Sequence, residues 1–206
     1  AEPEVLGLKI HGFEMSRAND SLKASGRWWI ENEQQYTSVA GHLQSRALDK
    51  TLELVDIKSS ILGSKTDVNF SLDWPGDPFD FALAHLNGKL DVHLSEGVLV
   101  DFNPGFGRIL SLLSIQSLEL RLRLDFSDVF TKGFSFDDIT TIVNIKNGIA
   151  HSDNLVMKAP AAELKMKGDV NLANKQLNLI ANVTTHISSS LPIAATIASG
   201  GNPIVG

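Results

Sequence analysis

The residues that could perform acid–base or metal chemistry are scattered along this sequence. None of the histidines has the i, i+4 partner and acidic neighbour with which a metallopeptidase helix binds and uses zinc. Isolated histidines lie more often on a protein surface than in such a site, and we interpret them that way. The six are His11, His42, His85, His93, His151 and His186.

Four aspartates lie close together in the sequence, in an arrangement that an acid–base pair or a cation site would need. They are Asp125, Asp128, Asp137 and Asp138. Serine, glycine and threonine surround them, and aspartate beside such residues typically accepts hydrogen bonds from nearby backbone N–H groups in turns. We therefore expect turn capping, and we predict no catalytic residue and no metal site.

The motifs for covalent catalysis and for nucleotide binding are incomplete. Residues 133–137 resemble the Gly-x-Ser-x-Gly elbow of hydrolases, but Asp137 stands where the second glycine should be. Residues 105–110 begin like a dinucleotide-binding loop, but Leu110 replaces its third glycine. The chain has no cysteine, which excludes thiol catalysis and disulfides. We predict that the protein is not an enzyme and that it needs no cofactor or nucleotide.

The composition is that of a folded chain with an acidic balance. Of 206 residues, 18 are basic and 24 are acidic, which gives a net charge of -6 and disfavours nucleic acid as a partner. The hydrophobic share of 43% against 20% charged residues is enough for a packed core. The longest apolar stretches, such as residues 191–198, are too short to cross a bilayer. Because the sequence begins without Met and stops in a Gly- and Ala-rich stretch, we expect a piece of a longer protein.

Alternation of apolar and polar residues is the strongest pattern in the chain. Residues 118–126 interleave apolar with charged side chains, as a half-buried strand does. The same spacing recurs in residues 86–94, 164–172 and 177–183, and more roughly in residues 5–13, 22–30, 37–44 and 65–74. Short turn signals separate the runs, at Glu96-Gly97, Asn147-Gly148, Asp153-Asn154, Ala159-Pro160 and Ala173-Asn174-Lys175. Loops this short predict an antiparallel meander.

Two segments depart from the alternation and predict short amphipathic helices. Residues 47–61 carry apolar side chains at helical spacing with charges between them. Residues 105–115 place a wider apolar stripe on one side. The stripe consists of Phe106, Ile109, Leu110 and Leu113.

Strands with one apolar side and so few helices leave an apolar surface that must be covered. Burial of one leucine side chain contributes roughly 1.5–3 kcal/mol, so residues 118–126 alone represent on the order of 10 kcal/mol. The sheet can pack on itself as a β-sandwich, associate with another copy, or curve around acyl chains. Alternation alone slightly favours the sandwich.

Four blocks of sequence, in a fixed order, carry a family resemblance. The first is a Leu-Asp-Trp-Pro-Gly-Asp-Pro turn at residues 72–78 with the glycine-containing run at 86–90. The second is a Pro-Gly-x-Gly-Arg helix at residues 101–115, the third and most specific is residues 124–137, and residues 147–168 complete the set. These blocks resemble the C-terminal region of a very long member of the AsmA-like family of bacterial envelope proteins.

This resemblance covers residues 66–192 best and implies both a fold and a function. Such proteins are anchored in the inner membrane by an N-terminal helix and cross the periplasm as a long β-groove with an apolar lining. They carry phospholipid toward the outer membrane. The chain would then be a lipid-conducting section in the periplasm. Its partners would be phospholipid acyl chains and the outer-membrane surface or an outer-membrane-proximal protein.

We accordingly predict a mainly β fold, an antiparallel and strongly curved sheet or open β-groove with two short amphipathic helices. Residues 1–65 form a looser β/α segment that continues into the groove of residues 66–190, and residues 191–206 are a Gly/Ala-rich tail. From the alternation, the groove lining comprises Leu90, Val92, Leu94, Leu118, Leu120, Leu122, Leu124, Leu164, Met166, Val170, Leu177 and Leu179.

The helix at residues 105–115 would plug the end of the groove or contact a bilayer through Phe106, Ile109, Leu110 and Leu113, unless these side chains cover the sheet as ordinary core. The alternative function is a non-enzymatic scaffold or docking domain for envelope assembly, with its apolar faces packed against each other. A lipid hydrolase that uses Asp125 or Asp137 with a histidine is a more distant third hypothesis.

Overall fold

The described part of the chain is almost entirely β-structure. The computed structural model describes residues 6–17, 20–53, 58–100, 133–160, 162–186 and 194–198. The elements in chain order are β1 (Gly7–Arg17), β2 (Asp20–Glu31), β3 (Gln34–Ser45), α1 (Leu48–Glu53), β4 (Ile61–Leu62), β5 (Lys65–Pro75), the 3-10 turn η1 (Leu83–His85), β6 (Asn87–Leu99), β7 (Phe134–Lys146), β8 (Ile149–Lys158), β9 (Ala162–Asn171), β10 (Gln176–Thr185) and β11 (Ala194–Ala198).

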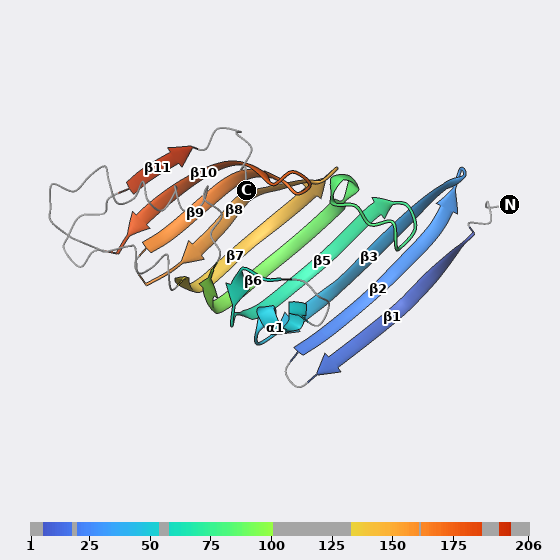
Figure 1. Cartoon of the computed structure of the whole chain (residues 1–206), viewed down its shortest axis with the longest axis horizontal. Coiled ribbons are helices and arrows are strands. Elements are labelled where there is room, and N and C mark those ends of the chain that lie inside the picture. Colours follow the sequence, from blue (N-terminus) through green and yellow to red (C-terminus); the bar gives the residue numbers. More distant parts are fainter. Residues whose placement is uncertain are drawn as a thin grey trace.

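These strands form one antiparallel sheet in a single layer. Ten of them pair in the order β1-β2-β3-β5-β6-β7-β8-β9-β10-β11, and β4 pairs with β6 beyond the end of β5. Figure 1 shows the strands side by side as a curved sheet. The predicted mainly β, curved antiparallel sheet is therefore confirmed. The β-sandwich that alternation alone slightly favours is wrong for the described strands, because each of them pairs with its neighbours in one continuous sheet.

Alternation gives this sheet one apolar and one polar face. Paired residues of neighbouring strands lie on the same face, so rows across the sheet can be compared directly. One row across β2, β3, β5, β6 and β7 consists of Leu22, Leu43, Val68, Val92 and Thr141. The neighbouring row consists of Ser21, Gln44, Asp67, His93 and Thr140. We call the side of the first row the apolar face and the other side the polar face.

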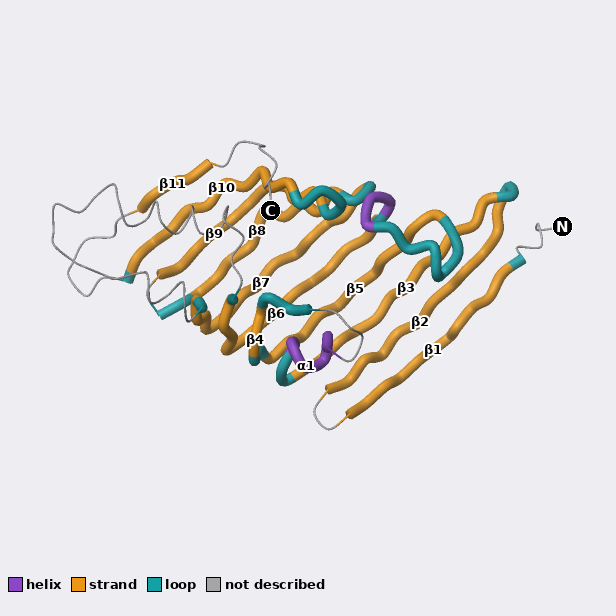
Figure 2. The backbone as a smooth tube through the Cα atoms, in the orientation of Figure 1, coloured by secondary structure: helices purple, strands orange, loops and turns teal. Residues whose placement is uncertain are grey.

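Two connecting segments cover the apolar face at opposite ends of the central strands. At one end, Leu48 of α1 and Ile61 of β4 pack against a buried cluster that includes Leu94 and Phe136. At the other end, residues 76–86 fold back over the sheet, and Leu86 packs with Trp74 and Ile145. Figure 2 shows α1 and η1 at these opposite ends. No second sheet of described residues covers the face between them.

Three of the five turn signals mark turns, and two lie inside strands. Asn147-Gly148 joins β7 to β8, Ala159-Pro160 lies between β8 and β9, and residues 173–175 join β9 to β10. Glu96-Gly97 is wrong as a turn, because it lies within β6, where Glu96 has a φ of 54°. Asp153-Asn154 is also wrong as a turn, because it forms a bulge within β8, where the register with β9 shifts.

The helix prediction for residues 47–61 is only partly correct. α1 has six residues, and Ile61 already belongs to β4, whose pairing with Leu99 returns the chain to the sheet. The predicted helix at residues 105–115 and the predicted strand at 118–126 lie outside the described residues. The sequence prediction assigns no strand to the residues of β7, which with β8 supplies the centre of the C-terminal half of the sheet.

Two strand glycines let neighbouring backbones approach closely. Gly88 in β6 has a φ of 139° and Gly168 in β9 a φ of 135°, a region that residues with a side chain rarely adopt. A Cβ atom at Gly88 would meet the carbonyl oxygen of Ser71, and one at Gly168 would meet that of Asn178. Glycine is therefore required at both positions for the adjacent strands to keep their spacing.

Candidate functional site

Most of the predicted lining residues lie together on the apolar face. A row across β6, β7, β8, β9 and β10 joins Leu94, Ile139, Met157, Leu164 and Val183. The eight predicted residues in described strands share this face, and they are Leu90, Val92, Leu94, Leu164, Met166, Val170, Leu177 and Leu179. Their contact with a lipid stays a prediction.

The other predicted site residues lie outside the described residues. They are Leu118, Leu120, Leu122 and Leu124 of the lining, and Phe106, Ile109, Leu110 and Leu113 of the helix. The described face is nevertheless continuous, because β6 and β7 pair directly along their length.

The sequence prediction missed the lining that the first strands and the central hairpin contribute. These strands add Leu8, Ile10, Phe13, Met15, Leu22, Trp28, Val39, Leu43, Val68, Phe70, Val143 and Met157 to the apolar face. Glycines hide the pattern, since Gly26 and Gly41 occupy positions of this face where an apolar side chain was expected. The ring of Phe70 lies over Gly41, so the space that the glycine leaves is filled by its neighbour.

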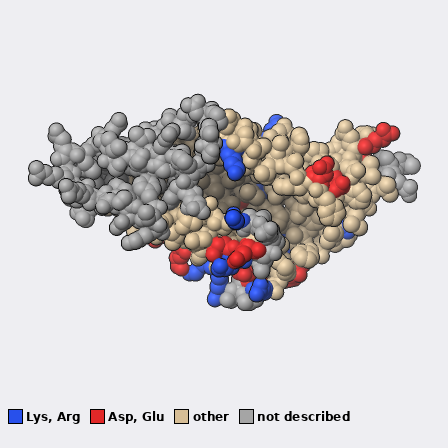
Figure 3. Space-filling model, viewed as in Figure 1, with Lys and Arg blue, Asp and Glu red and all other residues tan. Residues whose placement is uncertain are grey.

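Exposure of the apolar face rises steeply toward the edge strand β1. Leu164 and Val183, at the C-terminal half of the sheet, are each 1% exposed. On β1, Leu8 is 59% exposed and Phe13 is 52% exposed. Figure 3 shows the side of the sheet on which α1 lies. On its described part, uncharged side chains dominate the surface, and charged ones gather near α1. The face is thus a dry core at one end of the sheet and an open apolar surface at the other.

Hydroxyl groups on the apolar face are satisfied within the protein. The Thr141 hydroxyl lies 2.8 Å from that of Ser152, and the Thr37 hydroxyl donates to the carbonyl oxygen of Gly76 at 2.9 Å. The Thr66 hydroxyl donates to the carbonyl oxygen of Ser64 at 3.3 Å. These groups need no hydrogen bond from a ligand, so they do not interrupt the apolar character of the face.

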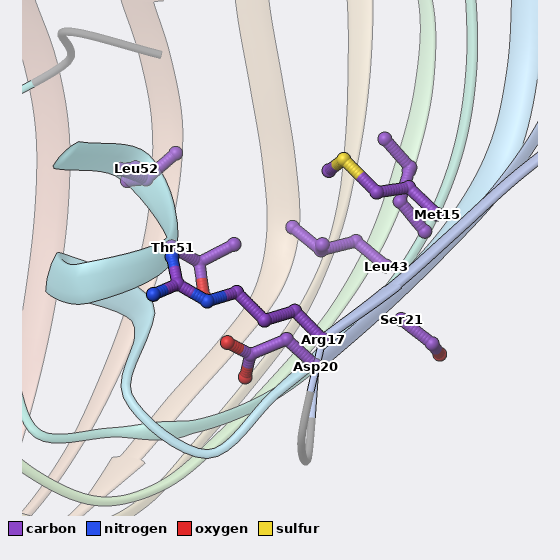
Figure 4. A pocket seen from close by; sticks show the side chains of 8 residues that line it. Met15, Arg17, Asp20, Ser21, Leu43, Thr51 and Leu52 are labelled. Atoms are coloured by element: carbon purple, nitrogen blue, oxygen red, sulfur yellow. The ribbon is translucent and has the colours of Figure 1, made fainter. Parts of the chain in front are cut away.

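A cavity of about 200 Å³ opens on the apolar face between β1 to β3 and α1. Its apolar lining comes from Met15, Leu22, Leu43 and Leu52. Figure 4 shows the Arg17 side chain extending past Asp20 toward Thr51 of α1, at the edge of this cavity. An apolar pocket beside an arginine suits a molecule with an apolar part and an anionic part.

Cross-strand histidine–aspartate pairs mark the polar face. His42 lies 2.8 Å from Asp67, His93 lies 2.6 Å from Asp138, and Nδ1 of His151 lies 2.7 Å from Asp169. These pairs link β3 to β5, β6 to β7 and β8 to β9. The histidines are therefore on the surface, as predicted, but they also tie neighbouring strands together.

Hydrogen bonds shift the pKa of two of these groups. The amide of Gln44, which donates to Asp67 at 2.8 Å, and then His42 lower the pKa of the Asp67 carboxyl. Asp169, and then Asp153, raise the pKa of His151 by accepting hydrogen bonds from its ring. Both shifts favour the charged form of the group, as hydrogen bonds to a charged group at a protein surface do.

One cluster on the polar face contains serine, histidine and aspartate, but its geometry does not suit catalysis. Nε2 of His93 contacts both Asp138, at 2.6 Å, and the Ser95 hydroxyl, at 3.3 Å. A catalytic triad needs the acid and the nucleophile on different ring nitrogens, so that the ring can pass a proton between them. Asp137 and Asp138 also lie within β7, so the expectation that they cap a turn is wrong. Asp125 and Asp128 lie outside the described residues.

No group of three or more histidine and acidic side chains within the described ranges could hold a metal ion. None of the helices in those ranges is long and apolar enough to cross a membrane.

Comparison with known proteins places the chain in a family. Residues 1–206 match the sequence profile of the family described as YhdP protein. Over 186 residues the chain is 36% identical to the intermembrane phospholipid transporter YhdP of Escherichia coli (strain K12), a match that covers 90% of this chain and 14% of that protein. The chain thus spans a small part of its relative, and no solved structure matches it. The match along its whole length shows that the chain belongs to the YhdP family.

Proposed function

We propose that the chain is a lipid-binding section of a bridge that carries phospholipid between the inner and outer membranes of a Gram-negative bacterium. The observation that carries the proposal is the apolar face, which crosses the nine paired strands from β1 to β10 and is open to solvent on β1. The relative of this chain in Escherichia coli is named an intermembrane phospholipid transporter, which supports lipid as the ligand.

In this proposal the sheet acts as a rigid apolar surface for acyl chains. Each CH₂ group moved from water onto the face contributes up to about 0.8 kcal/mol, so a chain in contact along several strands is held without specific bonds. Head groups stay at the wet rim of the face, and the polar face contacts the aqueous periplasm. Transport then needs no reaction, cofactor or nucleotide on this chain, and the protein is not an enzyme.

The proposed lining combines residues predicted from the sequence with those that the registers add. Leu90, Val92, Leu94, Leu164, Met166, Val170, Leu177 and Leu179 form the first group, together with the predicted Leu118, Leu120, Leu122 and Leu124. The helix residues Phe106, Ile109, Leu110 and Leu113 are proposed to plug the groove or to contact a bilayer. The partner at the far end is the outer-membrane surface or a protein near it, and the full-length protein is anchored in the inner membrane.

Native mass spectrometry of the gently purified chain, with extraction and identification of bound lipid, tests this function. Two neighbouring residues of β5 provide a matched pair of variants, because Val68 lies on the apolar face and Asn69 on the polar face. Val68→Asp and Asn69→Asp each add one negative charge. We expect phospholipid on the wild type and on Asn69→Asp, and its loss from Val68→Asp, since an acyl chain would have to desolvate the new carboxylate.

A thermal melt of each variant shows whether it is folded, and Val68→Thr, which keeps the side-chain shape, provides a milder change if Val68→Asp unfolds. Phospholipid retained by a folded Val68→Asp variant would contradict the proposal. A folded wild type that carries no lipid, with a melting temperature that added phospholipid does not change, would favour the scaffold or docking function instead.

A further inference from the structure

We propose that Arg17 binds the phosphate of an anionic phospholipid whose acyl chain occupies the cavity between β1 to β3 and α1. This inference rests on the proposed function, because it requires that the apolar face binds lipid. It goes further by assigning a head-group site to one end of that face.

The first support is the distribution of charge over the apolar face. Arg17 and Asp20 are paired across β1 and β2, and they are the charged residues that the described registers place on this face. The Asp20 carboxylate accepts a hydrogen bond from the backbone N–H of Arg46 at 3.1 Å. Arg17 is exposed and forms no ion pair with any residue that the structure describes. Its guanidinium therefore keeps its donors available to a ligand.

The second support is the cavity beside this guanidinium. Met15, Leu22, Leu43 and Leu52 give it an apolar lining. The Thr51 hydroxyl at its edge is already engaged, at 2.7 Å from the Ser45 hydroxyl. At about 200 Å³ the cavity is smaller than the ~300–1,000 Å³ of pockets for drug-sized ligands, so it fits a segment of one acyl chain better than a whole lipid.

The other charges at this end of the sheet are mostly neutralised or bound. Asp49 of α1 accepts a hydrogen bond from the backbone N–H of Gly63 at 2.9 Å, and Lys50 pairs with Glu53 at 3.2 Å. Arg46 is exposed, and it contacts Asp20 through its backbone N–H. A planar guanidinium donates two parallel hydrogen bonds to a phosphate, which makes Arg17 the group suited to hold the head group.

The Arg17 guanidinium and the apolar cavity are close enough to contact one ligand. Figure 4 shows Arg17 reaching across the cavity edge, with Met15 and Leu43 beside it and Ser21 directed to the other side of the sheet. A phosphate at Arg17 places the attached acyl chain beside the apolar lining. Free phosphate lacks the acyl chain and would contact Arg17 alone. A diacylglycerol lacks the negative charge and would contact the apolar lining alone.

Binding of two fluorescent probes to the 206-residue chain tests the site. The probes are phosphatidic acid and diacylglycerol with identical acyl chains. We expect Arg17→Gln to weaken phosphatidic acid binding about tenfold, which corresponds to about 1.4 kcal/mol, and to leave diacylglycerol binding unchanged. Arg17→Lys should retain part of the difference. Arg27→Gln is the matched control, because Arg27 lies on the polar face, 4.7 Å from the ring of Trp29, and loses the same charge.

Equal binding of phosphatidic acid by the wild type and Arg17→Gln overturns the head-group site and leaves the lipid-binding face intact. Binding of neither probe by the folded wild type overturns both proposals. Displacement of phosphatidic acid by an equal concentration of inorganic phosphate also overturns the lipid site, because the acyl chain would then add nothing to binding. If Arg17→Gln does not fold, Leu22→Trp fills the cavity while Arg17 remains, and unchanged phosphatidic acid binding by that variant overturns the proposal.

Discussion

Two leucine-to-alanine substitutions on the same face measure whether that face is open at one end. Leu164 on β9 is 1% exposed and belongs to the cluster with Leu94, Phe136 and Val183. Leu8 on β1 is 59% exposed, although the register with Trp28 places it on the same apolar face. If nothing else covers the face, the same substitution must have very different effects on the free energy of unfolding.

The expected magnitudes follow from these exposures. Leu164→Ala removes buried methyl groups and leaves a cavity, and such substitutions destabilise by roughly 2–5 kcal/mol. Less than half of the Leu8 side chain is out of water, and a fully buried leucine contributes roughly 1.5–3 kcal/mol. Leu8→Ala leaves no enclosed cavity, so we expect it to destabilise by less than about 1 kcal/mol.

Urea unfolding, followed by tryptophan fluorescence at two protein concentrations, measures the free energy of unfolding of both variants. Equal m-values would show that the two substitutions change stability and not the surface exposed on unfolding. Similar losses of stability for Leu8→Ala and Leu164→Ala would refute the open face. If the cost of Leu8→Ala rose with protein concentration, a second copy of the chain would be the cover. A small cost at every concentration agrees with a surface left for a ligand.

Three further predictions concern the strands themselves. The pKa of His151 is raised, so its pairing stabilises the fold fully below the ordinary histidine pKa of about 6.5, and this stabilisation is lost as the pH rises through the folded pKa of His151. An NMR titration should give His151 a pKa above the ordinary value and a lower pKa in Asp169→Asn, and a wild-type pKa at or below the ordinary value contradicts the pairing. Asn154→Ala removes an acceptor of a β7 backbone N–H at 2.9 Å and should cost about 1 kcal/mol in urea unfolding, whereas Asn154→Asp should cost less. Gly168→Ala should destabilise by roughly 1–3 kcal/mol in a thermal melt, against little change for Gly12→Ala, which has open space around it; equal melting temperatures would argue against the strained backbone.

The faces of most strands could be predicted from the sequence, but the layer structure could not. Spacing by two residues assigns each side chain to one of two faces, and the rows through Val68 and Asp67 show that neighbouring strands agree on this assignment. Alternation says nothing about what lies over the apolar side, because a second sheet, another copy and a lipid all require the same pattern. The single layer depends on the pairing order, which a sequence of similar strands does not encode locally.

One error in the prediction comes from residues that are typical of turns but lie inside a strand. The sequence predicts a turn at Asp153-Asn154, but the side-chain oxygen of Asn154 accepts a hydrogen bond from the backbone N–H of Ile142, where a regular strand would offer a carbonyl. The extra residue in β8 is thereby accommodated as a bulge. The helix predicted at residues 47–61 is too long for a different reason. β4 pairs with β6 in the same register as β5, so the chain must return to the sheet by Ile61.

The distortion at Glu96 shows why a lining cannot be assigned from alternation alone. Buried positions in β6 fall at Leu94 and Gly97, three residues apart, and those in β7 fall at Phe136 and Ile139, also three apart. Strict alternation would have turned Gly97 and Phe136 to the polar face. Because Gly97 pairs with Phe136, and Leu94 with Ile139, both strands change parity at the same place.

The apolar face therefore continues across the distortion, and the missing side chain at Gly97 leaves room for the Phe136 ring. One strand changing alone would have placed an apolar residue opposite a polar one and broken the face. The continuity that lipid binding requires is thus a property of the paired strands, and substitutions that test it should be chosen by cross-strand register.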